Sequence, residues 1–327
     1  MAQKIEVKIL VDYLCFTVRL LDFMQGHQSD GWLRDFIEMA FHLGSGSVDF
    51  ECKKAFYGYS VSYSRNGITY CFGGRDDIYI QMSGSGCRYW ETLNPGKDWI
   101  SYIIRMRESF STLHFSRLDI AGDAFNLLDI RKIQVAATKQ QYVSRWKRYL
   151  VCAGNAENYV LFGSPTSDFR LRIYDKTEER TQAGCKEVPE NWVRCEFQMR
   201  NDAAKSFIDS WCKMGDIGDT YCGIMRNQLR FWSVFDGVHY DRMKLKSWWQ
   251  QFLGNGERIK MAYQGGLEYN LEAVERYVYH QAGSSIRTLI EAKQGDISQL
   301  LHVVKNAKLN DLQKELLANA VHVDLPM

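Results

Sequence analysis

Arginines, carboxylates and one tyrosine recur at alternate positions along three short stretches of the sequence. These stretches cover residues 117–124, 169–176 and 192–200. Side chains along a β-strand point alternately to its two faces, so each stretch, if it is a strand, gathers these groups on one face. Carboxylates suit a hard metal ion, and guanidinium groups suit phosphate. The residue types therefore indicate phosphoryl-transfer chemistry.

The alternation separates a polar face from an apolar face in all three stretches. The polar face would hold Arg117, Asp119, Ala121, Asp123, Arg170, Arg172, Tyr174, Lys176, Trp192, Arg194, Glu196, Gln198 and Arg200. Any half-buried antiparallel sheet has a polar and an apolar face, so a plain solvated surface is the alternative interpretation. A solvated surface would favour Lys, Glu, Thr and Ser, however, whereas this face combines carboxylates with several arginines.

The three stretches belong to a longer series of predicted strands. Period-two segments separated by Gly, Asn, Asp and Ser turns predict an α+β fold of antiparallel β-sheets flanked by helices. Strands are expected at residues 5–18, 54–74 with an Asn66-Gly67 hairpin turn, 78–84, 115–125, 158–164, 169–176 and 192–200. Helices are expected at residues 30–43, 97–110, 130–150 and 201–213. The glycine-rich segments 44–49 and 83–88 are expected to be turns, because the Gly-Lys-Ser/Thr of a phosphate loop does not follow them.

The pattern divides the chain into a catalytic domain at residues 1–240 and a mainly helical region at 241–327. The catalytic domain would consist of two β-rich halves, about 1–110 and 111–240. Asp12 and Asp119 each lie in a predicted strand near the start of a half, which hints at an internal duplication. Beyond residue 240, helical segments follow N-cap residues such as Asn270 and Ser284.

Composition narrows the class of protein and its compartment. The nine cysteines form no Cys-x-x-Cys pair, and no uncharged stretch approaches the eighteen residues or so of a membrane span. We therefore expect reduced thiols in a cytoplasmic protein that does not contact the membrane. The net charge of +2 is too small to indicate nucleic acid by itself, so the local distribution of charge matters more.

Basic residues alternate with aromatic residues in segments 142–149, 226–232 and 242–249. This mixture can contact phosphates and stack on bases, and it predicts a DNA contact at Arg145, Lys147 and Arg148. Solvated helix faces with extended Lys and Arg side chains are the alternative interpretation.

Five segments, in this order and spacing, resemble one known family. They are VDYLCFTV (11–18), YIQMSGSGCR (79–88), SRLDIAGDAF (116–125), VLFGSPTSDFRLRIYDKTEER (160–180) and RCEFQMRNDAAKSF (194–207). Together they are similar to the replication initiation factor family, which contains rolling-circle initiators of plasmids and phages and the related relaxases of conjugative elements. The resemblance spans roughly residues 5–235.

The resemblance implies a metal-dependent enzyme that nicks and rejoins DNA through a tyrosine, which stays attached to the 5′ end. Mapped onto this chain, the nucleophile is Tyr174 and the metal ligands are Asp119 and Glu196. Because no His-x-His motif occurs, the metal should be bound by oxygen and be Mg²⁺ or Mn²⁺. Asp123 should lie outside the metal site, since residues four apart on a regular strand are separated by roughly 13 Å.

The neighbouring basic residues have expected roles as well. Arg172 and Lys176 should offset charge on the phosphoryl oxygens and favour the ionised form of Tyr174. Arg170 and Arg194 are expected to contact DNA.

The expected partner is origin DNA, recognised as a duplex and cut as a single strand, together with a helicase of the host or the element. Whether the protein forms a homodimer is left open. Two alternatives also stay open. One is a member of the same fold that binds an origin without cutting. The other is a metal nuclease in which water attacks and no protein becomes attached.

Overall fold

The computed structural model describes residues 5–19, 30–44, 50–154, 157–233, 244–256, 258–259, 261, 274–275, 277–309, 313–314 and 317. The first half contains β1 (Glu6–Arg19), α1 (Asp30–Ala40), β2 (Glu51–Lys53), β3 (Val61–Arg65), β4 (Ile68–Phe72), β5 (Asp77–Met82), α2 (Gly84–Leu93) and α3 (Trp99–Ser109). The second half contains β6 (His114–Phe125), α4 (Ile130–Thr138), β7 (Tyr142–Ser144), β8 (Tyr149–Ala153), β9 (Asn158–Phe162), β10 (Phe169–Asp175), α5 (Lys176–Gln182), β11 (Trp192–Arg200), α6 (Asn201–Met214), α7 (Ile217–Gln228) and β12 (Leu229–Phe231).

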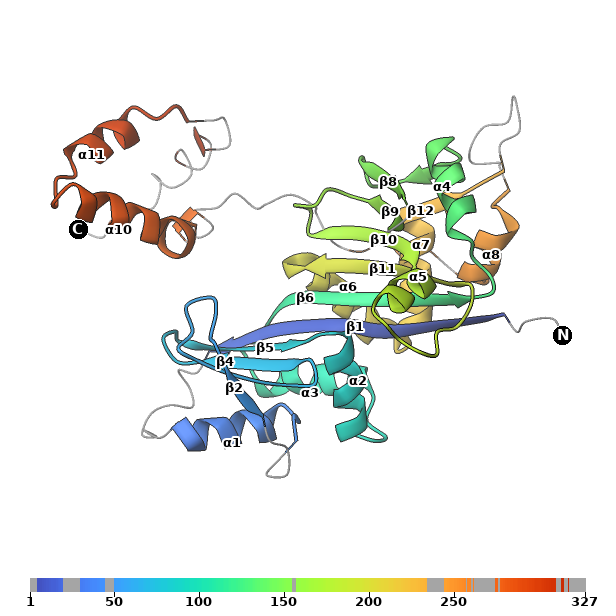
Figure 1. Ribbon diagram of the computed structural model, residues 1–327, viewed down its shortest axis with the longest axis horizontal. Coiled ribbons are helices and arrows are strands. Elements are labelled where there is room, and N and C mark those ends of the chain that lie inside the picture. The colour runs from blue at the N-terminus through green and yellow to red at the C-terminus, as the bar shows by residue number, and fades with distance from the viewer. Residues whose placement is uncertain are drawn as a thin grey trace. The chain divides into compact units, whose positions relative to one another are not determined.

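One antiparallel sheet runs through both halves. Within the described residues it has ten strands in the order β2-β3-β4-β5-β1-β6-β11-β10-β9-β8, and β12 pairs separately with β7. Each half places its first strand, β1 or β6, at the centre of the sheet. Its last strand within this sheet, β5 or β11, lies next to that strand. The long strands β1 and β6 meet at the centre (Figure 1). The topology therefore repeats, as Asp12 on β1 and Asp119 on β6 indicated, and the predicted α+β fold is confirmed.

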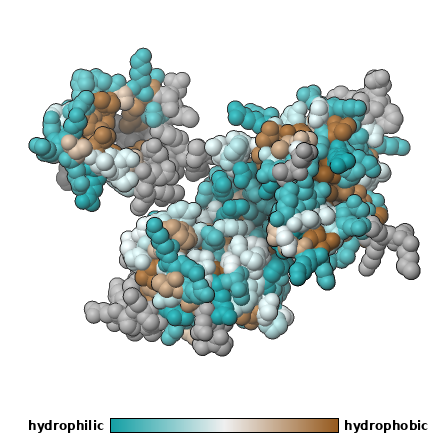
Figure 2. Space-filling model, in the orientation of Figure 1, coloured by the Kyte–Doolittle hydropathy of each residue, from teal (hydrophilic) through white to brown (hydrophobic). Residues whose placement is uncertain are grey.

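One face of the sheet is covered by helices and forms the main core. Its strands contribute alternate apolar residues, including Phe16, Ile80, Leu118, Ile173 and Phe197. Helices α6 and α7 lie behind the central strands in Figure 1, while the short α5 lies in front of them. Figure 2 shows that hydrophilic residues predominate on the side turned to the viewer and that hydrophobic residues gather there only in small patches. The face of the sheet that these helices leave uncovered is called the open face here, and it carries the predicted polar residues.

The hairpin between β3 and β4 follows the prediction. Its turn residues Asn66 and Gly67 have φ values of 46° and 86°, the left-handed region that a two-residue type I′ turn requires. The predicted strand over 54–74 is interrupted before β3, because residues 54–60 form an irregular segment with a turn at Tyr57 and Gly58.

Two other sequence predictions were wrong. The helix expected at 130–150 ends at Thr138, and the two short strands β7 and β8 follow it. Gln140 at φ 53° turns the chain there, and the aromatic Tyr142 and Tyr149 then pack as strand residues. The segment 83–88, expected to be a turn, begins helix α2, and the Ser83 side chain caps it by accepting a hydrogen bond from the Gly86 N–H.

The chain separates into two compact units, residues 1–265 and 266–327. The predicted boundary at residue 240 lies outside the described residues. Helix α8 (Ser247–Leu253) packs in the first unit, where the buried Trp249 ring lies 5.0 Å from that of Phe231. The second unit contains η2 (Tyr277–Ala282), α10 (Gly283–Ala292) and α11 (Ser298–Lys305), which confirms a helical C-terminal part. None of the described helices is both long and apolar enough to span a membrane.

Candidate active site on the open face of the sheet

Register on the three central strands of the second half places the predicted catalytic residues along a diagonal. Asp119 on β6 pairs with Gln198 on β11, and Glu196, two residues away, pairs with Arg172 on β10. Tyr174, two residues after Arg172 on β10, pairs with Arg194 on β11. Diagonal neighbours in an antiparallel sheet are roughly 7–8 Å apart, within reach of long side chains. The strand alternation read from the sequence therefore brings these residues together on one face.

The Tyr174 hydroxyl makes two polar contacts. It donates a hydrogen bond to Glu196 Oε2 at 3.2 Å and accepts one from Lys176 Nζ at 3.4 Å. Lys176 Nζ is bound more closely by the Glu179 carboxylate, at 2.7 and 2.9 Å. The Arg172 guanidinium lies over the Tyr174 ring, 4.5 Å from its centroid. Tyr174 is therefore held at the ring and at the hydroxyl, and only 5% of it is exposed.

The expectation that Arg172 and Lys176 favour the phenolate stays a prediction, and in this arrangement other influences oppose it. Burial raises the pKa of the Tyr174 hydroxyl well above its ordinary value, and the negative charge of Glu196 adds to the rise, although the charge of Arg194 lowers the pKa of Tyr174. Lys176 is paired with Glu179, and Arg172 lies over the ring face instead of beside the oxygen. The protein alone therefore stabilises the neutral phenol, and a reaction with Tyr174 as the nucleophile would need a proton acceptor.

Asp119 and Glu196 are both buried, with 2% and 6% of each residue exposed. Arg117 donates to both oxygens of Asp119, at 3.0 and 3.1 Å from Nε. Glu196 Oε1 accepts a hydrogen bond from Gln198 Nε2 at 2.6 Å. Burial raises the pKa of Asp119 to about 7; the hydrogen bonds and charge of Arg117 oppose the rise, and the charge of Glu196 adds to it. The two carboxylates thus repel each other in a poorly solvated place.

This donor set fits a divalent metal bound by two protein carboxylates. A cation between Asp119 and Glu196 would relieve the repulsion that raises the Asp119 pKa. Mg²⁺ commonly uses one or two carboxylates and completes its shell with water and substrate phosphates. Within the described residues, no group of three or more His, Cys, Asp or Glu side chains could hold a metal ion. An ionised carboxylate has about four lone-pair sites, so Asp119 could accept from Arg117 and still bind a metal.

Asp123 has a different partner. Arg194 Nε and Nη2 bind its two oxygens at 2.6 and 2.8 Å, and Arg194 Nη1 binds Asp12 at 2.7 Å. Asp12 reaches this face because the register of β1 against β6 shifts between Val11 and Tyr13, as at a β-bulge. Only 5% of Arg194 is exposed, and its guanidinium joins two carboxylates. The DNA contact predicted for Arg194 stays a prediction.

An open cavity of about 910 Å³ lies over this end of the face. Its walls include Arg172, Tyr174, Lys176 and Arg194 from the second half, and Asp12 and Arg88 from the first half. The cavity joins the two halves at the central strands. The predicted nucleophile therefore borders a space lined by groups that can bind phosphate. Arg170 lies further along β10, where Nε donates to Gln198 Oε1.

The basic segment around Arg145, Lys147 and Arg148 lines a separate cavity of about 500 Å³. Arg145 donates to the Asn227 carbonyl at 3.2 Å. Trp146 donates to the Phe169 carbonyl at 2.9 Å, and its ring lies 5.1 Å from that of Phe169. Trp146 packs partly against the core and also lines this cavity, so the base stacking expected of this residue stays a prediction. The predicted phosphate contacts of the basic residues stay predictions.

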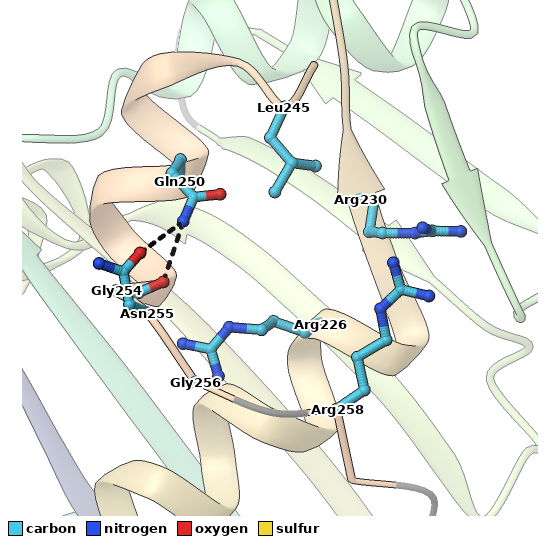
Figure 3. A pocket seen from close by; sticks show the side chains of 8 residues that line it. All are labelled: Arg226, Arg230, Leu245, Gln250, Gly254, Asn255, Gly256 and Arg258. Atoms are coloured by element: carbon cyan, nitrogen blue, oxygen red, sulfur yellow. Dashed lines mark hydrogen bonds between the residues drawn. The ribbon is translucent and has the colours of Figure 1, made fainter. Parts of the chain in front are cut away.

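A second basic segment, 226–232, has a structural role at Arg226 (Figure 3). The Arg226 guanidinium donates to the Leu253 carbonyl at the C-terminal end of α8, which is a favourable place for a cation. A Cβ added at Gly256 would come within 2.7 Å of Arg226 Nη1, so glycine leaves room for this contact. Arg226, Arg230 and Arg258 line a cavity of about 240 Å³ there.

Several residues of the site were not assigned roles from the sequence. Arg117 and Gln198 lie on the predicted polar face and could have been found as partners of Asp119 and Glu196. Glu179 follows the strand in α5, and its pairing with Lys176 depends on where that helix begins. Asp12 depends on an irregular register that the sequence does not reveal.

Three comparisons relate the chain to known proteins. A family model described as "Replication initiation factor" matches residues 113–304, which is more than half of the 327-residue chain. The putative DNA relaxase NicK of Bacillus subtilis (strain 168) is 24% identical over 299 residues, covering 86% of this chain and 83% of that protein.

The fold is also similar to a solved structure, that of a rolling-circle replication initiator protein from Geobacillus stearothermophilus. The two share 24% sequence identity with a TM-score of 0.63, and the match covers 79% of this chain and 100% of the other. Because the family model covers more than half of the chain, the chain belongs to the replication initiation factor family.

Proposed function

We propose that this protein nicks and rejoins one strand of origin DNA, with Tyr174 as the nucleophile. The observation that carries the proposal is the position of the Tyr174 hydroxyl. It borders a cavity lined by Arg172 and Lys176, and it already donates a hydrogen bond to Glu196. Membership of the replication initiation factor family, and similarity to a putative DNA relaxase, support the same reaction.

The reaction would exchange one phosphoester bond for another. Tyr174 Oη attacks the scissile phosphorus, the bond from phosphorus to the 3′-oxygen breaks, and the 5′-phosphate remains on the tyrosine. The phenolic proton passes to Glu196 Oε2, to which it already points. The departing 3′-oxygen takes up a proton and becomes a free hydroxyl. Attack by a 3′-hydroxyl on the phosphotyrosine reverses these steps and rejoins the strand.

The remaining residues would position Tyr174 and offset negative charge on the phosphate. Arg172 holds the tyrosine ring and, with Lys176, faces the cavity where charge develops on the phosphoryl oxygens. Asp119 and Glu196 would hold Mg²⁺ or Mn²⁺, which when bound offsets negative charge on the phosphate and favours the phenolate. Asp123 would act only through Arg194.

The partner implied by this function is origin DNA, recognised as a duplex and cut as a single strand. A helicase of the host or the element would then unwind the duplex from the nick, and the reaction would take place in the cytoplasm.

The test uses supercoiled DNA that carries the candidate origin, followed by denaturing electrophoresis with and without protease. Wild-type protein should give a linear strand that carries protein on its 5′ end and that migrates faster after protease treatment. Tyr174→Phe removes one hydroxyl and should abolish both the nick and the attached protein. Peptide mapping of the adduct should place the nucleotide on residue 174.

Tyr159→Phe is the matched control, because Tyr159 pairs with Tyr174 across β9 and β10 and its ring also contacts Arg172. It should nick like the wild type. Nicked DNA without attached protein would favour attack by water, and DNA binding without nicking would favour a non-cutting initiator. An adduct that persists in Tyr174→Phe would refute the assignment.

A further inference from the structure

The open face of the first half carries a group of aromatic residues where the second half carries charged ones. Tyr13 on β1 and Tyr79 on β5 belong to this face, and Phe56 and Tyr57 lie in the turn before β3. The Tyr57 ring lies 4.9 Å from that of Phe56 and 5.8 Å from that of Tyr79, and the Phe56 and Tyr79 rings are 5.7 Å apart. We name these four residues the aromatic platform.

Tyr57 presents its ring to solvent from a constrained backbone. Seventy per cent of this residue is exposed. Its φ of 55° lies in the left-handed region, which is an outlier for a bulky side chain and costs free energy. Arg75 donates to the Tyr57 carbonyl at 3.4 Å and is itself fixed by Asp77 at 2.9 Å. The fold therefore keeps the Tyr57 ring exposed, although burial of the ring does not offset the cost of its backbone conformation.

The platform continues into the candidate active site. Tyr13 is the cross-strand partner of Asp119, and the Arg117 guanidinium lies 4.2 Å from the Tyr13 ring centroid while it binds Asp119. Both residues lie on the open face of the sheet. A DNA strand that passes over Asp119 would meet Tyr13 next. The exposed Lys54 precedes Tyr57 by three residues in the chain and adds a positive charge to this segment.

We propose that the aromatic platform stacks unpaired bases of the DNA strand beside the cleavage site. This inference rests on the proposed function, because only a single strand exposes the faces of its bases. Aromatic rings accept any base, and nearby cations attract the connecting phosphates, which is how sequence-tolerant single-strand sites bind. The platform would therefore hold the cut strand in place with little dependence on its sequence.

The test is fluorescence polarisation with a labelled oligothymidylate, which contains no origin, in the presence of a chelator. Tyr57→Asn removes the ring and suits the left-handed backbone, so the fold should be retained. It should weaken binding about fivefold or more, the usual scale of one lost base stack. Tyr57→Phe keeps the ring and should bind like the wild type. The slope of log affinity against log salt should not change, because no phosphate contact is lost.

An abasic oligonucleotide of equal length provides the second control. Wild type and Tyr57→Asn should bind it equally, since it has the phosphates without the bases. Equal affinity of the two proteins for oligothymidylate would overturn the proposal, as would an equal loss of affinity on both oligonucleotides. A change in oligomeric state with unchanged DNA affinity would instead identify the platform as a contact between copies of the chain.

The failure of this inference can be told apart from the failure of the proposed function. If the platform is wrong and Tyr174 is the nucleophile, the protein–DNA adduct forms while Tyr57→Asn binds oligothymidylate normally. If Tyr174 is not the nucleophile, the adduct is absent or persists in Tyr174→Phe, whether or not Tyr57→Asn binds weakly.

Discussion

The two halves of the sheet share a topology but differ in what they place on the open face. In the second half, β6, β11 and β10 carry Asp119, Glu196 and Tyr174. In the first half, the corresponding β1, β5 and β4 carry Cys15, Tyr79 and Cys71, which form a small apolar cluster. The helix-covered faces of both halves are apolar and belong to one core.

This difference shows that the two faces of the sheet have separate roles: the apolar face stabilises the fold, and the open face carries the candidate active site. The apolar face buries large side chains in both halves, and that burial stabilises the sheet whatever lies opposite. The open face is less constrained, so one half can carry charged groups and the other aromatic rings. Charged groups that become buried need partners, and the ion pairs of Arg117 and Arg194 supply them.

The largest expected effect on nicking comes from removing the charge of Asp119 or Glu196. Asp119→Asn and Glu196→Gln keep the shapes of the side chains but should each reduce metal-dependent nicking by roughly 10²-fold or more, because the proposed metal site would lose a charged ligand. Initial nicking rates against Mg²⁺ concentration measure the loss, and a chelator should have a similar effect on the wild type.

Asp123→Asn is the comparison variant, since Asp123 pairs with Arg194. It should retain the metal dependence of the wild type. If Asp123→Asn abolished metal-dependent nicking while Asp119→Asn left it intact, the two aspartates would have been assigned the wrong way round.

The second effect concerns stability. Arg194→Ala would leave Asp12 and Asp123 without their shared guanidinium, and 3% of the Asp123 side chain is exposed. Breaking such a buried pair typically lowers the free energy of unfolding by about 3–5 kcal/mol, which denaturant titration can measure. Arg107→Ala breaks an ion pair with Asp209 in which both side chains are 38% exposed, and it should cost about 0–1 kcal/mol. Equal losses in the two variants would mean that the buried charges are not coupled as described.

A third, smaller effect is expected at the basic segment beside β7. Replacing Arg145, Lys147 and Arg148 by alanine should weaken duplex binding and reduce the slope of log affinity against log salt by roughly one unit per lost phosphate contact. Arg131→Ala with Lys132→Ala, on the exposed side of α4, is the control and should leave the slope unchanged. An unchanged slope in the triple variant would remove this segment from the DNA interface.

The period-two pattern was sufficient to predict much of the fold and part of the site. It gave β11 its observed bounds and placed Asp119, Glu196 and Tyr174 on one face, because strand alternation is a local property. The helix predicted over 130–150 failed because Gln140 adopts a positive φ and the aromatic residues after it find partners far away in the sequence.

Features that depend on distant partners could not be predicted. Asp12 joins the site through an irregularity in the pairing of β1 with β6, and register between strands about a hundred residues apart is not a local property. The raised pKa of Tyr174 likewise depends on burial and on the exact place of Glu196. The sequence suggested which groups meet, while the structure determines which form of each group is stable.

The smallest expected effect is on cysteine reactivity, and it tests the apolar cluster on the open face of the first half. Cys15 and Cys71 are 3% and 0% exposed, and Cys15 accepts a hydrogen bond from Ser116 Oγ at 3.0 Å. Burial raises the pKa of both thiols, so little thiolate is present at neutral pH, and the thiolate is the reactive form. Iodoacetamide at pH 8 should therefore label the exposed Cys52 in the native protein and leave Cys15 and Cys71 unmodified, as read by peptide mass spectrometry. Unfolding in denaturant should make all three react, which shows that the fold protects them. Rapid native labelling of Cys15, with nicking lost in proportion, would mean that the first half carries reactive chemistry as well, and the contrast between the two halves would no longer hold.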